Sequence, residues 1–521
     1  MGPKKDSVAV IGAGMGGMAA AIRLAAAGRD VTVFEAHDWP GGKMRVVDSP
    51  AGPVDAGPTV LTLRPVLEQL FAAAGVSLDT HLTLQPLGVL ARHHWRDGAM
   101  LDLLPDAEAN AHTIGAVFGA RARTEFNRFE RDTRALFDAF RAPIMERARP
   151  SALAAAHAAL LRPALLPWLL PGRKLGGMLE ARFTEPRLRQ LFGRYATYVG
   201  GNPMLAPAVL GLIWQAEAAG VWTVKGGMAG LARALAGVLE RCGGSLRLNT
   251  PVTGILTQGG QVRGLRLSCG EEVTFAQVIF NGDPAALPYL LDAPRPAPPR
   301  RQTQPRSLSA QVWTFAGEVK ATGLGRHALA YHTVFFADDP AQEFGPLAMG
   351  SGPQDTTIYV CAQDRAEHVP DGPERFQFIL NAPPLPSGAQ SQTEPACKTD
   401  PFARLERFGL HLMPHLTDQA LTTPARFAQL FPHSQGALYG LSPNGTLATF
   451  QRPTTRSKVT GLYLAGGGVH PGAGVPMALM SGRHAAEAAL KDRISAPMSR
   501  PMAMHGGIST GSATAARAPS R

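Results

Sequence analysis

The feature that most constrains the fold of this chain is a short glycine-rich stretch, GAGMGG, at residues 12–17. It stands between an apolar run typical of a strand, SVAVI, and an alanine-rich run typical of a helix. Gly12, Gly14 and Gly17 match the G-x-G-x-x-G pattern, whose glycines allow a tight turn, the approach of a pyrophosphate and close helix–strand packing. Gly16 belongs to the same turn. The stretch therefore predicts a βαβ unit that holds a dinucleotide at the start of a helix.

The second strand of this unit, DVTVFE, ends at Glu35. An acidic side chain about 20 residues after the glycines can accept hydrogen bonds from the ribose hydroxyls of adenosine. A glycine turn with a purely structural role is the alternative. The combination of strand, helix and Glu35 makes that alternative the weaker one.

Two more glycine turns follow this strand, and they favour a flavin dinucleotide over a nicotinamide one. In PGGKMR, Gly41 and Gly42 form a flexible turn beside Lys43 and Arg45, whose charges could neutralise a diphosphate or a flavin oxygen. Taken singly, each of these cations is also explained as a solvated loop residue. In VDAGPT, the run from Asp55 to Thr59, which includes Pro58, forms a third turn of close backbone approach.

A similar unit returns near the other end of the chain. Residues 461–490 read GLYLAGGGVHPGAGVPMALMSGRHAAEAAL, which predicts a strand, a glycine-rich turn and a helix. Such a turn at a helix start is expected where backbone amides approach a cofactor. The motifs alone do not show why one chain carries two of these units.

Composition narrows the classes of protein. With 521 residues and 45% hydrophobic content, the chain can form roughly two or three domain-sized units. Its four cysteines are widely spaced without a metal or disulfide pattern, which indicates a reducing cytoplasm and predicts no metal site. The N-terminus, MGPKKDSVAV, has no secretory core, so we expect no exported precursor.

The net charge of +11 favours an anionic partner. No zinc-finger, basic-zipper or RNA-binding pattern is found, so a membrane surface is favoured and nucleic acid is not expected. The very apolar segment at residues 151–174, SALAAAHAALLRPALLPWLLPGRK, is interrupted by Arg162 and prolines, and a spanning helix needs about 20 apolar residues.

We therefore expect this segment to lie on a membrane, or alternatively to form a buried helical hairpin under a lid. On a membrane, its interfacial residues would be Leu165, Leu166, Trp168, Leu169 and Leu170, and its headgroup contacts Arg147, Arg149, Arg162, Arg173 and Lys174.

The order of patterns predicts an α/β protein with discontinuous domains. Dinucleotide-binding parts are expected at residues 1–75, 221–291 and 451–490. Residues 76–220 are expected to be a helical part for substrate and membrane contact, and residues 292–450 a substrate-domain sheet with strands at LSAQVWTF, HTVFFA, TTIYVCA and RFQFIL. Residues 491–521 lack periodicity and are expected to be disordered.

Together, GAGMGG, Glu35, PGGKMR, VDAGPTVLT and LYLAGGGVHPGAGVPMALMSG resemble the motifs of the FAD-dependent carotenoid desaturases, the phytoene desaturase family. The resemblance runs from Val8 to about Leu490. VDAGPTVLTLRPVLEQLF, RLRQLFGRYATYVGGNP, GALYG and HPGAGVP look most similar to a bacterial subgroup, the 1-hydroxycarotenoid 3,4-desaturases or methoxyneurosporene dehydrogenases. The resemblance implies a Rossmann-like FAD-binding domain of the GR2 type, a discontinuous mixed-sheet substrate domain and a helical membrane-associating region.

The resemblance also implies that both ends of the chain close on one FAD, which explains the two glycine units. The N-terminal glycines would hold the diphosphate, and the backbone of Val252 would contact the adenine end. Residues expected near the flavin ring and ribityl chain are Gly466, Gly467, His470, Pro476 and Met477, and Gly42, Lys43, Pro58 and Thr59 complete the predicted cofactor site. No motif identifies a general base. His470 is the candidate catalytic residue, against the alternative of a histidine that only hydrogen-bonds its loop.

The implied activity is desaturation of the C3–C4 bond of an acyclic 1-hydroxy or 1-methoxy carotenoid, such as 1-hydroxyneurosporene, by a cytoplasmic protein peripheral on the inner membrane. No second dinucleotide motif is found, so an external electron acceptor, oxygen or a quinone, is expected. Alternatives within the family are phytoene or neurosporene desaturation and polyene isomerisation. A lipid-binding escort protein and a flavin amine oxidase are more distant alternatives, and no aromatic pair can be placed as an amine cage.

Overall fold

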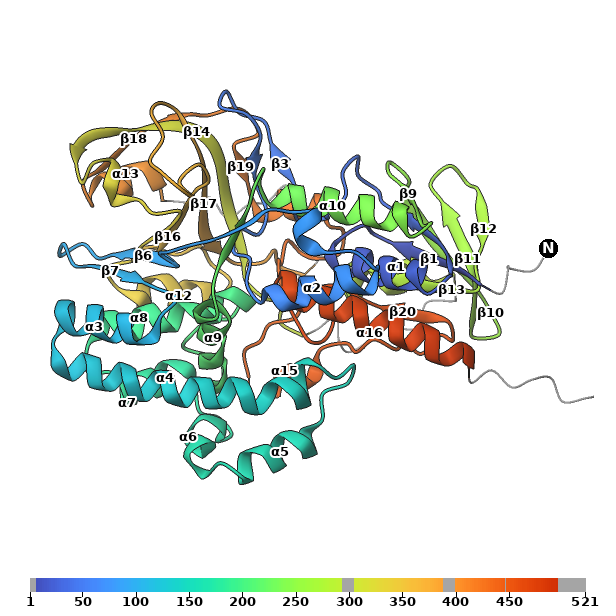
Figure 1. Ribbon diagram of the computed structural model, residues 1–521, viewed down its shortest axis with the longest axis horizontal. Coiled ribbons are helices and arrows are strands. Elements are labelled where there is room, and N and C mark those ends of the chain that lie inside the picture. Colours follow the sequence, from blue (N-terminus) through green and yellow to red (C-terminus); the bar gives the residue numbers. More distant parts are fainter. Residues whose placement is uncertain (1–5, 293–303, 388–398, 446, 495–521) are drawn as a thin grey trace, which may run out of the picture.

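A parallel sheet of five strands forms the part of the molecule to the right in Figure 1, within a computed structural model that describes residues 6–292, 304–387, 399–445 and 447–494. The strand order is β20–β13–β1–β2–β9. The strands are β1 (Ser7–Ile11), β2 (Asp30–Phe34), β9 (Ser245–Arg247), β13 (Gln277–Phe280) and β20 (Leu462–Leu464). Segments from the beginning, middle and end of the chain thus share one sheet. The predicted Rossmann-like fold is confirmed.

Three helices cover this sheet: α1 (Met15–Ala26), α10 (Met228–Arg241) and α16 (Val475–Ile494). Helix α1 consists largely of alanine and glycine, so α16 can lie very close to it. A Cβ atom added at Gly482 of α16 would stand 2.2 Å from the carbonyl oxygen of Gly16. The prediction of a disordered tail from Lys491 is wrong for the last helical turn, which ends at Ile494, and residues 495–521 lie outside the described residues.

A small antiparallel sheet stands beside the parallel one. It consists of β10 (Val252–Gln258), β11 (Gln261–Leu267) and β12 (Glu272–Thr274). The hairpin between β10 and β11 turns at Gly259 and Gly260, and both have a positive φ that glycine adopts without strain.

The second large sheet is mixed, and its strand order is β18–β14–β17–β16–β15–β6–β7, with β19 paired to β14. The predicted runs form β14 (Ser309–Gly323), β15 (His332–Phe335), β16 (Ile358–Ala362) and β17 (Glu374–Ala382). The other strands are β6 (Ala91–His94), β7 (Met100–Leu103), β18 (Leu410–His415) and β19 (Leu421–Thr422). Strands β6 and β7 were not predicted, because they are short and lack a clear apolar alternation. Residues 293–303, most of the proline-rich stretch at residues 292–306, lie outside the described residues.

A helical layer covers the lower side of this sheet in Figure 1. It contains α3 (Ala107–Phe118), α4 (Ala120–Phe140), α7 (Leu175–Arg182), α8 (Pro186–Gly193), η4 (Arg194–Val199), η5 (Ala208–Ile213) and α9 (Trp214–Ala218). Its core is aromatic: the rings of Phe129 and Phe192 lie 4.4 Å apart, and Phe192 packs against Trp214. This core continues to Val334 and Phe336 at the large sheet, so layer and sheet share one apolar interior.

The apolar segment at residues 151–174 forms α5 (Ala152–Leu160) and α6 (Leu166–Leu169), which project from the helical layer at the bottom of Figure 1. Leu165 and Trp168 are buried in the aromatic core, so the prediction that these two side chains enter a membrane interface is wrong. In so short a segment, the spacing of apolar residues in the sequence does not distinguish the side chains that face the protein core from those that face solvent. In the described part of the chain, no helix has the length and apolar character needed to span a membrane.

Candidate functional site

The N-terminal glycine turn is packed so tightly that side chains cannot enter it. Gly12 has a φ of +95°, and its N–H donates to the Phe34 carbonyl at 2.7 Å. A Cβ atom at Gly17 would stand 2.2 Å from the Gly12 carbonyl oxygen, and one at Gly16 would stand 2.5 Å from the Gly466 nitrogen. The glycines are thus required by the approach of backbone to backbone.

The start of α1 can receive an anion. Gly14 occupies the N-cap position, so no side chain satisfies the first amides, and the first turn contains no acidic residue. Free N–H groups and the positive end of the helix dipole favour a phosphate at this position. The geometry agrees with the diphosphate contact expected for Gly12, Gly14 and Gly17.

Glu35 lies directly beside this turn and is buried. Its carboxylate accepts hydrogen bonds from the N–H of Ala13 at 2.7 Å and of His37 at 3.1 Å. The N–H of Thr250 donates to the Glu35 carbonyl at 2.7 Å, and β10 begins two residues later at Val252. The structure therefore brings Glu35 and Val252 to the same end of the site, where ribose and adenine are expected.

The two ends of the chain meet at Asn281, which follows β13 at the carboxyl edge of the parallel sheet. Its Nδ2 donates to the Gly12 carbonyl at 3.1 Å. Its Oδ1 is buried without a hydrogen-bond partner among the described residues and would be 2.8 Å from a Cβ atom at either Gly16 or Gly466. Sequence reasoning missed this residue, although ligands of such sheets bind at the carboxyl ends of the strands.

These observations test whether FAD fits. Gly14, Gly16 and Gly17 form a cradle that a Cβ atom would fill, α1 offers uncapped amides, and Glu35 supplies a buried carboxylate bonded to the same turn. Asn281 adds an unpaired acceptor at the junction of the two halves. The residues present fit an extended dinucleotide between the two chain ends.

The second and third glycine turns close over the first. A Cβ atom at Gly42 would lie 3.2 Å from the Gly14 Cα, and the N–H of Gly41 donates to the Ala13 carbonyl at 2.9 Å. Lys43 donates to the Leu438 carbonyl and lies 5.5 Å from the ring of Phe431. Burial lowers the pKa of Lys43 to about 8.

Thr59 follows Pro58 in the third turn, and its hydroxyl lies 2.6 Å from the hydroxyl of Tyr359 on β16. The turn itself is held by Gln363, whose side-chain amide bonds the backbone of Asp55 at both its N–H and its carbonyl. This loop therefore connects the cofactor side of the molecule with the large sheet.

The C-terminal turn between β20 and α16 carries the other predicted residues. The N–H of Gly466 donates to Ser481 Oγ at 2.7 Å, and Pro476 and Met477 form the first turn of α16. Arg452 donates to the carbonyls of Gly467 and Tyr439 at 3.0 Å each, which joins this turn to the preceding loop. Arg452 was not recognised in the sequence, since no local pattern marks it.

His470 lies in the same turn and is fully buried. Its Nε2 lies 2.8 Å from the Ile144 carbonyl oxygen and 3.0 Å from that of Arg147, so Nε2 carries the proton. Burial lowers the pKa of His470, which keeps the ring neutral, and Nδ1 has no hydrogen-bond partner among the described residues. The contacts show a loop-anchoring histidine with one free lone pair.

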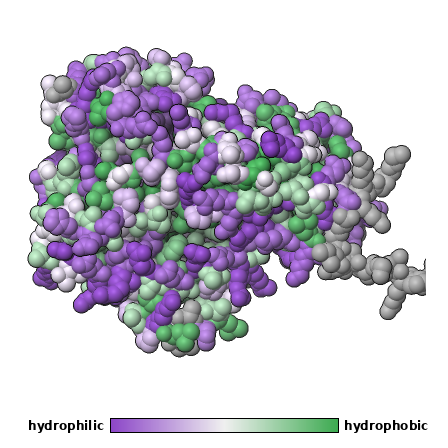
Figure 2. Space-filling model, viewed as in Figure 1, coloured by the Kyte–Doolittle hydropathy of each residue, from purple (hydrophilic) through white to green (hydrophobic). Residues whose placement is uncertain are grey.

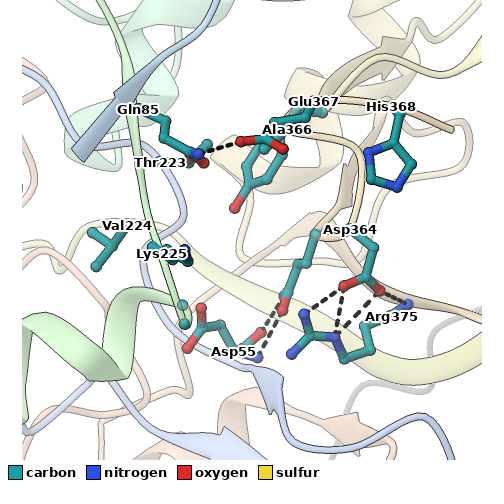
Figure 3. Close-up of a pocket in the computed structure, with 14 residues that line it drawn as sticks. Asp55, Gln85, Thr223, Val224, Lys225, Asp364, Ala366, Glu367, His368 and Arg375 are labelled. Carbon is teal, nitrogen blue, oxygen red and sulfur yellow. Dashed lines mark hydrogen bonds and ion pairs between the residues drawn. The ribbon is translucent and has the colours of Figure 1, made fainter. Parts of the chain in front are cut away.

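A cavity of about 260 Å³ opens between the large sheet and the pair β5 (Leu84–Pro86) and β8 (Trp222–Val224). Figure 3 shows Asp55 and Lys225 on one side of it and Glu367 and His368 on the other. Asp55 caps α10 through the N–H groups of Met228 at 2.6 Å and Ala229 at 3.1 Å, while burial raises its pKa. The remaining lining residues are Gln85, Thr223, Val224, Gly226, Gly227, Tyr331, Gln363, Asp364, Ala366 and Arg375.

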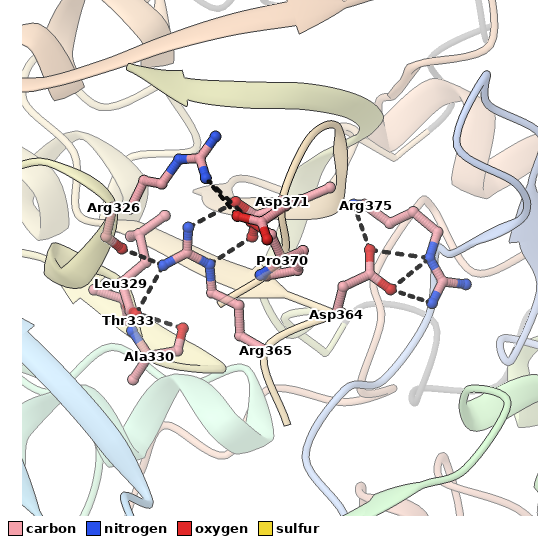
Figure 4. Close-up of polar contacts among 10 residues, drawn as sticks. Arg326, Leu329, Ala330, Thr333, Asp364, Arg365, Pro370, Asp371 and Arg375 are labelled. Atoms are coloured by element: carbon pink, nitrogen blue, oxygen red, sulfur yellow. Dashed lines mark hydrogen bonds and ion pairs between the residues drawn. The ribbon is translucent and has the colours of Figure 1, made fainter. Parts of the chain in front are cut away.

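Two ion pairs stiffen the sheet beside this cavity (Figure 4). Arg375 pairs with Asp364, and Arg365 forms a two-pronged pair with Glu374 in which both side chains are buried. Arg365 also donates to the Leu329 carbonyl at 3.1 Å. These residues hold β15, β16 and β17 together and touch no predicted cofactor residue.

Known proteins resemble this chain in both sequence and fold. The sequence matches the flavin-containing amine oxidoreductases over residues 15–490. This chain belongs to that family. Within it, hydroxyneurosporene desaturases from Cereibacter sphaeroides and Rhodobacter capsulatus are 53% and 50% identical, covering 93% and 94% of this chain and 97% and 99% of the relatives. A lycopene-forming phytoene desaturase from Paracoccus is 30% identical over 95% of this chain and 99% of its own.

The fold is shared with solved flavoenzymes. Cyclohexylamine oxidase from Brevibacterium oxydans superposes with a TM-score of 0.57 at 16% identity, covering 94% of this chain and 99% of that one. The predictions of a carotenoid desaturase relative, of an oxidoreductase and of FAD as the cofactor of the family are confirmed.

Proposed function

We propose that this protein desaturates the C3–C4 bond of acyclic 1-hydroxy or 1-methoxy carotenoids, such as 1-hydroxyneurosporene, in carotenoid biosynthesis. The observation that carries the proposal is the contrast in identity. Relatives named hydroxyneurosporene desaturase are 53% and 50% identical over nearly the whole chain, whereas the phytoene desaturase is 30% identical. This contrast favours a substrate with an oxygenated end group over phytoene.

The geometry supports a flavin-dependent oxidation. When bound, FAD supplies an acceptor for the hydride that leaves one of the two carbons. The chain's own residues orient the cofactor through the glycine turns and Glu35, and they exclude water through the apolar interior shared by the helical layer and the large sheet. The second hydrogen leaves as a proton. His470 remains a proposed proton acceptor, since its free Nδ1 is neutral and unpaired among the described residues.

The test uses the holoenzyme with 1-hydroxyneurosporene, in a pigment-free bacterial host and then as purified protein with added oxygen or a quinone. A product two mass units lighter with red-shifted absorbance supports the proposal. An unchanged mass with shifted bands would indicate isomerisation, and turnover of phytoene or neurosporene alone would reassign the substrate. A compound that restores turnover in the absence of oxygen is identified as the electron acceptor of the enzyme.

We also propose that the protein binds the cytoplasmic face of the inner membrane through α5 and α6. Leu153 and Leu161 are 86% and 70% exposed, and Leu166 and Leu170 are exposed beside them. Figure 2 shows apolar surface at the lower edge of the molecule, where these helices project. Exposed arginines border it, namely Arg147, Arg149, Arg162 and Arg173. Apolar side chains ringed by cations suit an anionic lipid surface.

Pelleting with liposomes of anionic and of neutral lipid tests this second proposal. Replacing Leu153, Leu161 and Leu170 by serine should abolish pelleting, whereas serine at Leu324 and Met349, exposed apolar residues outside this segment, should leave it unchanged. Equal pelleting of the two folded variants would place the contact elsewhere.

A further inference from the structure

Three nitrogen atoms in the apolar interior lack a hydrogen-bond partner among the described residues: His93 Nε2, His332 Nε2 and Arg194 Nε. His93 lies on β6, His332 on the neighbouring β15, and Arg194 at the start of η4 in the helical layer. Unpaired buried polar atoms are rare, and each destabilises the fold when it is left unsatisfied. The group as a whole therefore points to a ligand.

The two histidines lie on one face of the large sheet, which packs against the helical layer that carries Arg194. In the β6–β15 register His93 pairs with Val334, and side chains alternate along a strand, so His93, His332 and Val334 lie on the same face of the sheet. Val334 belongs to the aromatic core of the helical layer. Burial, followed by the charge of Arg194, lowers the pKa of both His93 and His332, so both rings are neutral.

The protonation of the rings follows from their contacts. His93 Nδ1 lies 3.2 Å from the Leu101 carbonyl oxygen and must donate to it, so its free Nε2 is an acceptor. His332 Nδ1 lies 2.6 Å from the Tyr359 hydroxyl, which itself lies 2.6 Å from the Thr59 hydroxyl. Either tautomer of His332 is compatible with this chain of contacts. The site thus offers one acceptor and one nitrogen that can donate or accept.

Arg194 is held rigidly within the helical layer. Its guanidinium donates to the Tyr198 hydroxyl at 3.0 Å and pairs with Glu217 at 3.4 Å. Tyr195 also donates to Glu217, and the rings of Tyr195 and Tyr198 lie 4.8 and 5.4 Å from the guanidinium carbon. Because Arg194 and Tyr195 pair with the carboxylate of Glu217, these residues form a fixed polar cluster within apolar surroundings.

We propose that His332, with His93 beside it, binds the C1 hydroxyl of the carotenoid end group and thereby sets the preference for oxygenated substrates. A hydroxyl both donates and accepts, so it donates to His93 Nε2 and accepts from the Nε2–H tautomer of His332, in which Nδ1 accepts from the Tyr359 hydroxyl. Its oxygen is three bonds from C3, so its binding site must lie near the flavin, and Thr59 links this site to the predicted cofactor loop. Tyr331, which lines the cavity, packs edge-on against His332 at 4.8 Å and connects the site with that opening.

This inference rests on the proposed function, and paired substrates separate the two. The holoenzyme is offered 1-hydroxyneurosporene and neurosporene in competition, and kcat/KM is measured for each. His332→Phe should lower the preference for the hydroxylated substrate about tenfold, the size expected when one buried hydrogen bond is lost. Tyr359→Phe, which removes only the hydroxyl behind His332, should lower it less.

His94→Phe is the matched control, because His94 lies on the opposite face of β6, stacks on Phe335 and bonds the Ala328 carbonyl. It should leave the preference unchanged. A second readout is the Kd of the desaturated hydroxy product compared with that of its deoxy analogue, measured by carotenoid absorbance, which does not depend on turnover. The inference would be overturned if the wild-type enzyme selects the hydroxylated substrate and folded, FAD-loaded His332→Phe keeps the same ratio of kcat/KM values and the same ratio of Kd values. A wild-type enzyme inactive on hydroxylated substrates would overturn the proposed function instead.

Discussion

The closeness of α1 and α16 provides a direct test of the idea that two chain ends form one flavin site. Gly482→Ala adds one methyl group where the two helices touch. The new Cβ atom would stand 2.2 Å from the Gly16 carbonyl oxygen and 2.8 Å from the Ala19 Cβ, although contacts below 3.0 Å are essentially never seen. Because the first neighbour is backbone, the helices must separate by about 1 Å to restore an ordinary contact.

Two effects oppose each other in this substitution. Alanine is favoured over glycine inside a helix by about 1 kcal/mol, which stabilises the variant. Overpacking costs about 1–3 kcal/mol, and more where backbone must move. We expect overpacking to dominate, and we expect the moved Gly16 carbonyl to widen the glycine turn that faces Gly466, so that flavin is lost as well as stability.

The measurement is the FAD content of purified protein, from the ratio of flavin to protein absorbance, together with the temperature at which flavin fluorescence appears on heating. Gly237→Ala is the matched control, because Gly237 is exposed in α10 and an added Cβ meets no atom within 4 Å. This control should be as yellow as the wild type and slightly more stable. If Gly482→Ala equals Gly237→Ala in both readouts, the contact between the two half-sites does not control flavin binding.

Three further predictions follow from other contacts. Glu35→Ala removes the carboxylate that accepts from Ala13 and His37, so the protein should purify without FAD, while Glu68→Ala in an exposed pair with Arg64 should not change flavin content. The pKa of Lys43 in the folded FAD-free protein is about 8, below the usual value of about 10.4. Between about pH 8 and about pH 10.4 the unfolded chain therefore binds more protons than the folded protein, and the free energy of unfolding should rise with pH over this range. Lys43→Met should flatten that rise in urea titrations at about pH 7 and about pH 10, and an unchanged slope would contradict the assignment. Glu374→Gln leaves the buried Arg365 without a counter-charge and should cost about 3–5 kcal/mol in urea unfolding, whereas Asp371→Asn, in the exposed pair with Arg326, should cost less than about 1 kcal/mol.

The elements that the sequence predicted well are those decided by local rules. The turn at Gly12–Gly17, the alanine-rich helix after it, and the strand, turn and helix at residues 461–490 all appear where pattern and propensity placed them. Strands of four or five residues were found only where an apolar run marked them. Strands β6 and β7 escaped, because β6 pairs with β15, more than two hundred residues away in the chain, and this pairing lends the two strands an order that their own residues do not show.

The pattern of apolar residues in the sequence also did not predict which apolar side chains are buried. Leu165 and Leu166 are adjacent residues of the same type, yet Leu165 packs into the aromatic core and Leu166 faces solvent. Which of them is buried depends on where α4 and η5 lie, and that is a property of the packed layers. The same holds for Asn281, whose role at the flavin site arises only when β13 is placed next to β1.

By itself, the sequence determined the two glycine units, the acidic residue that ends β2, and membership of a flavoprotein family, because a close backbone approach to a phosphate imposes glycines at fixed local spacing. Only the tertiary structure decided that the two units face each other across Asn281, that His93 and His332 face the helical layer that carries Arg194, and that Tyr359 joins His332 to Thr59. Hydrogen bonds and charges act over a few ångströms in space whatever the separation along the chain. A site assembled from five distant segments therefore leaves no periodic trace in the sequence that encodes it.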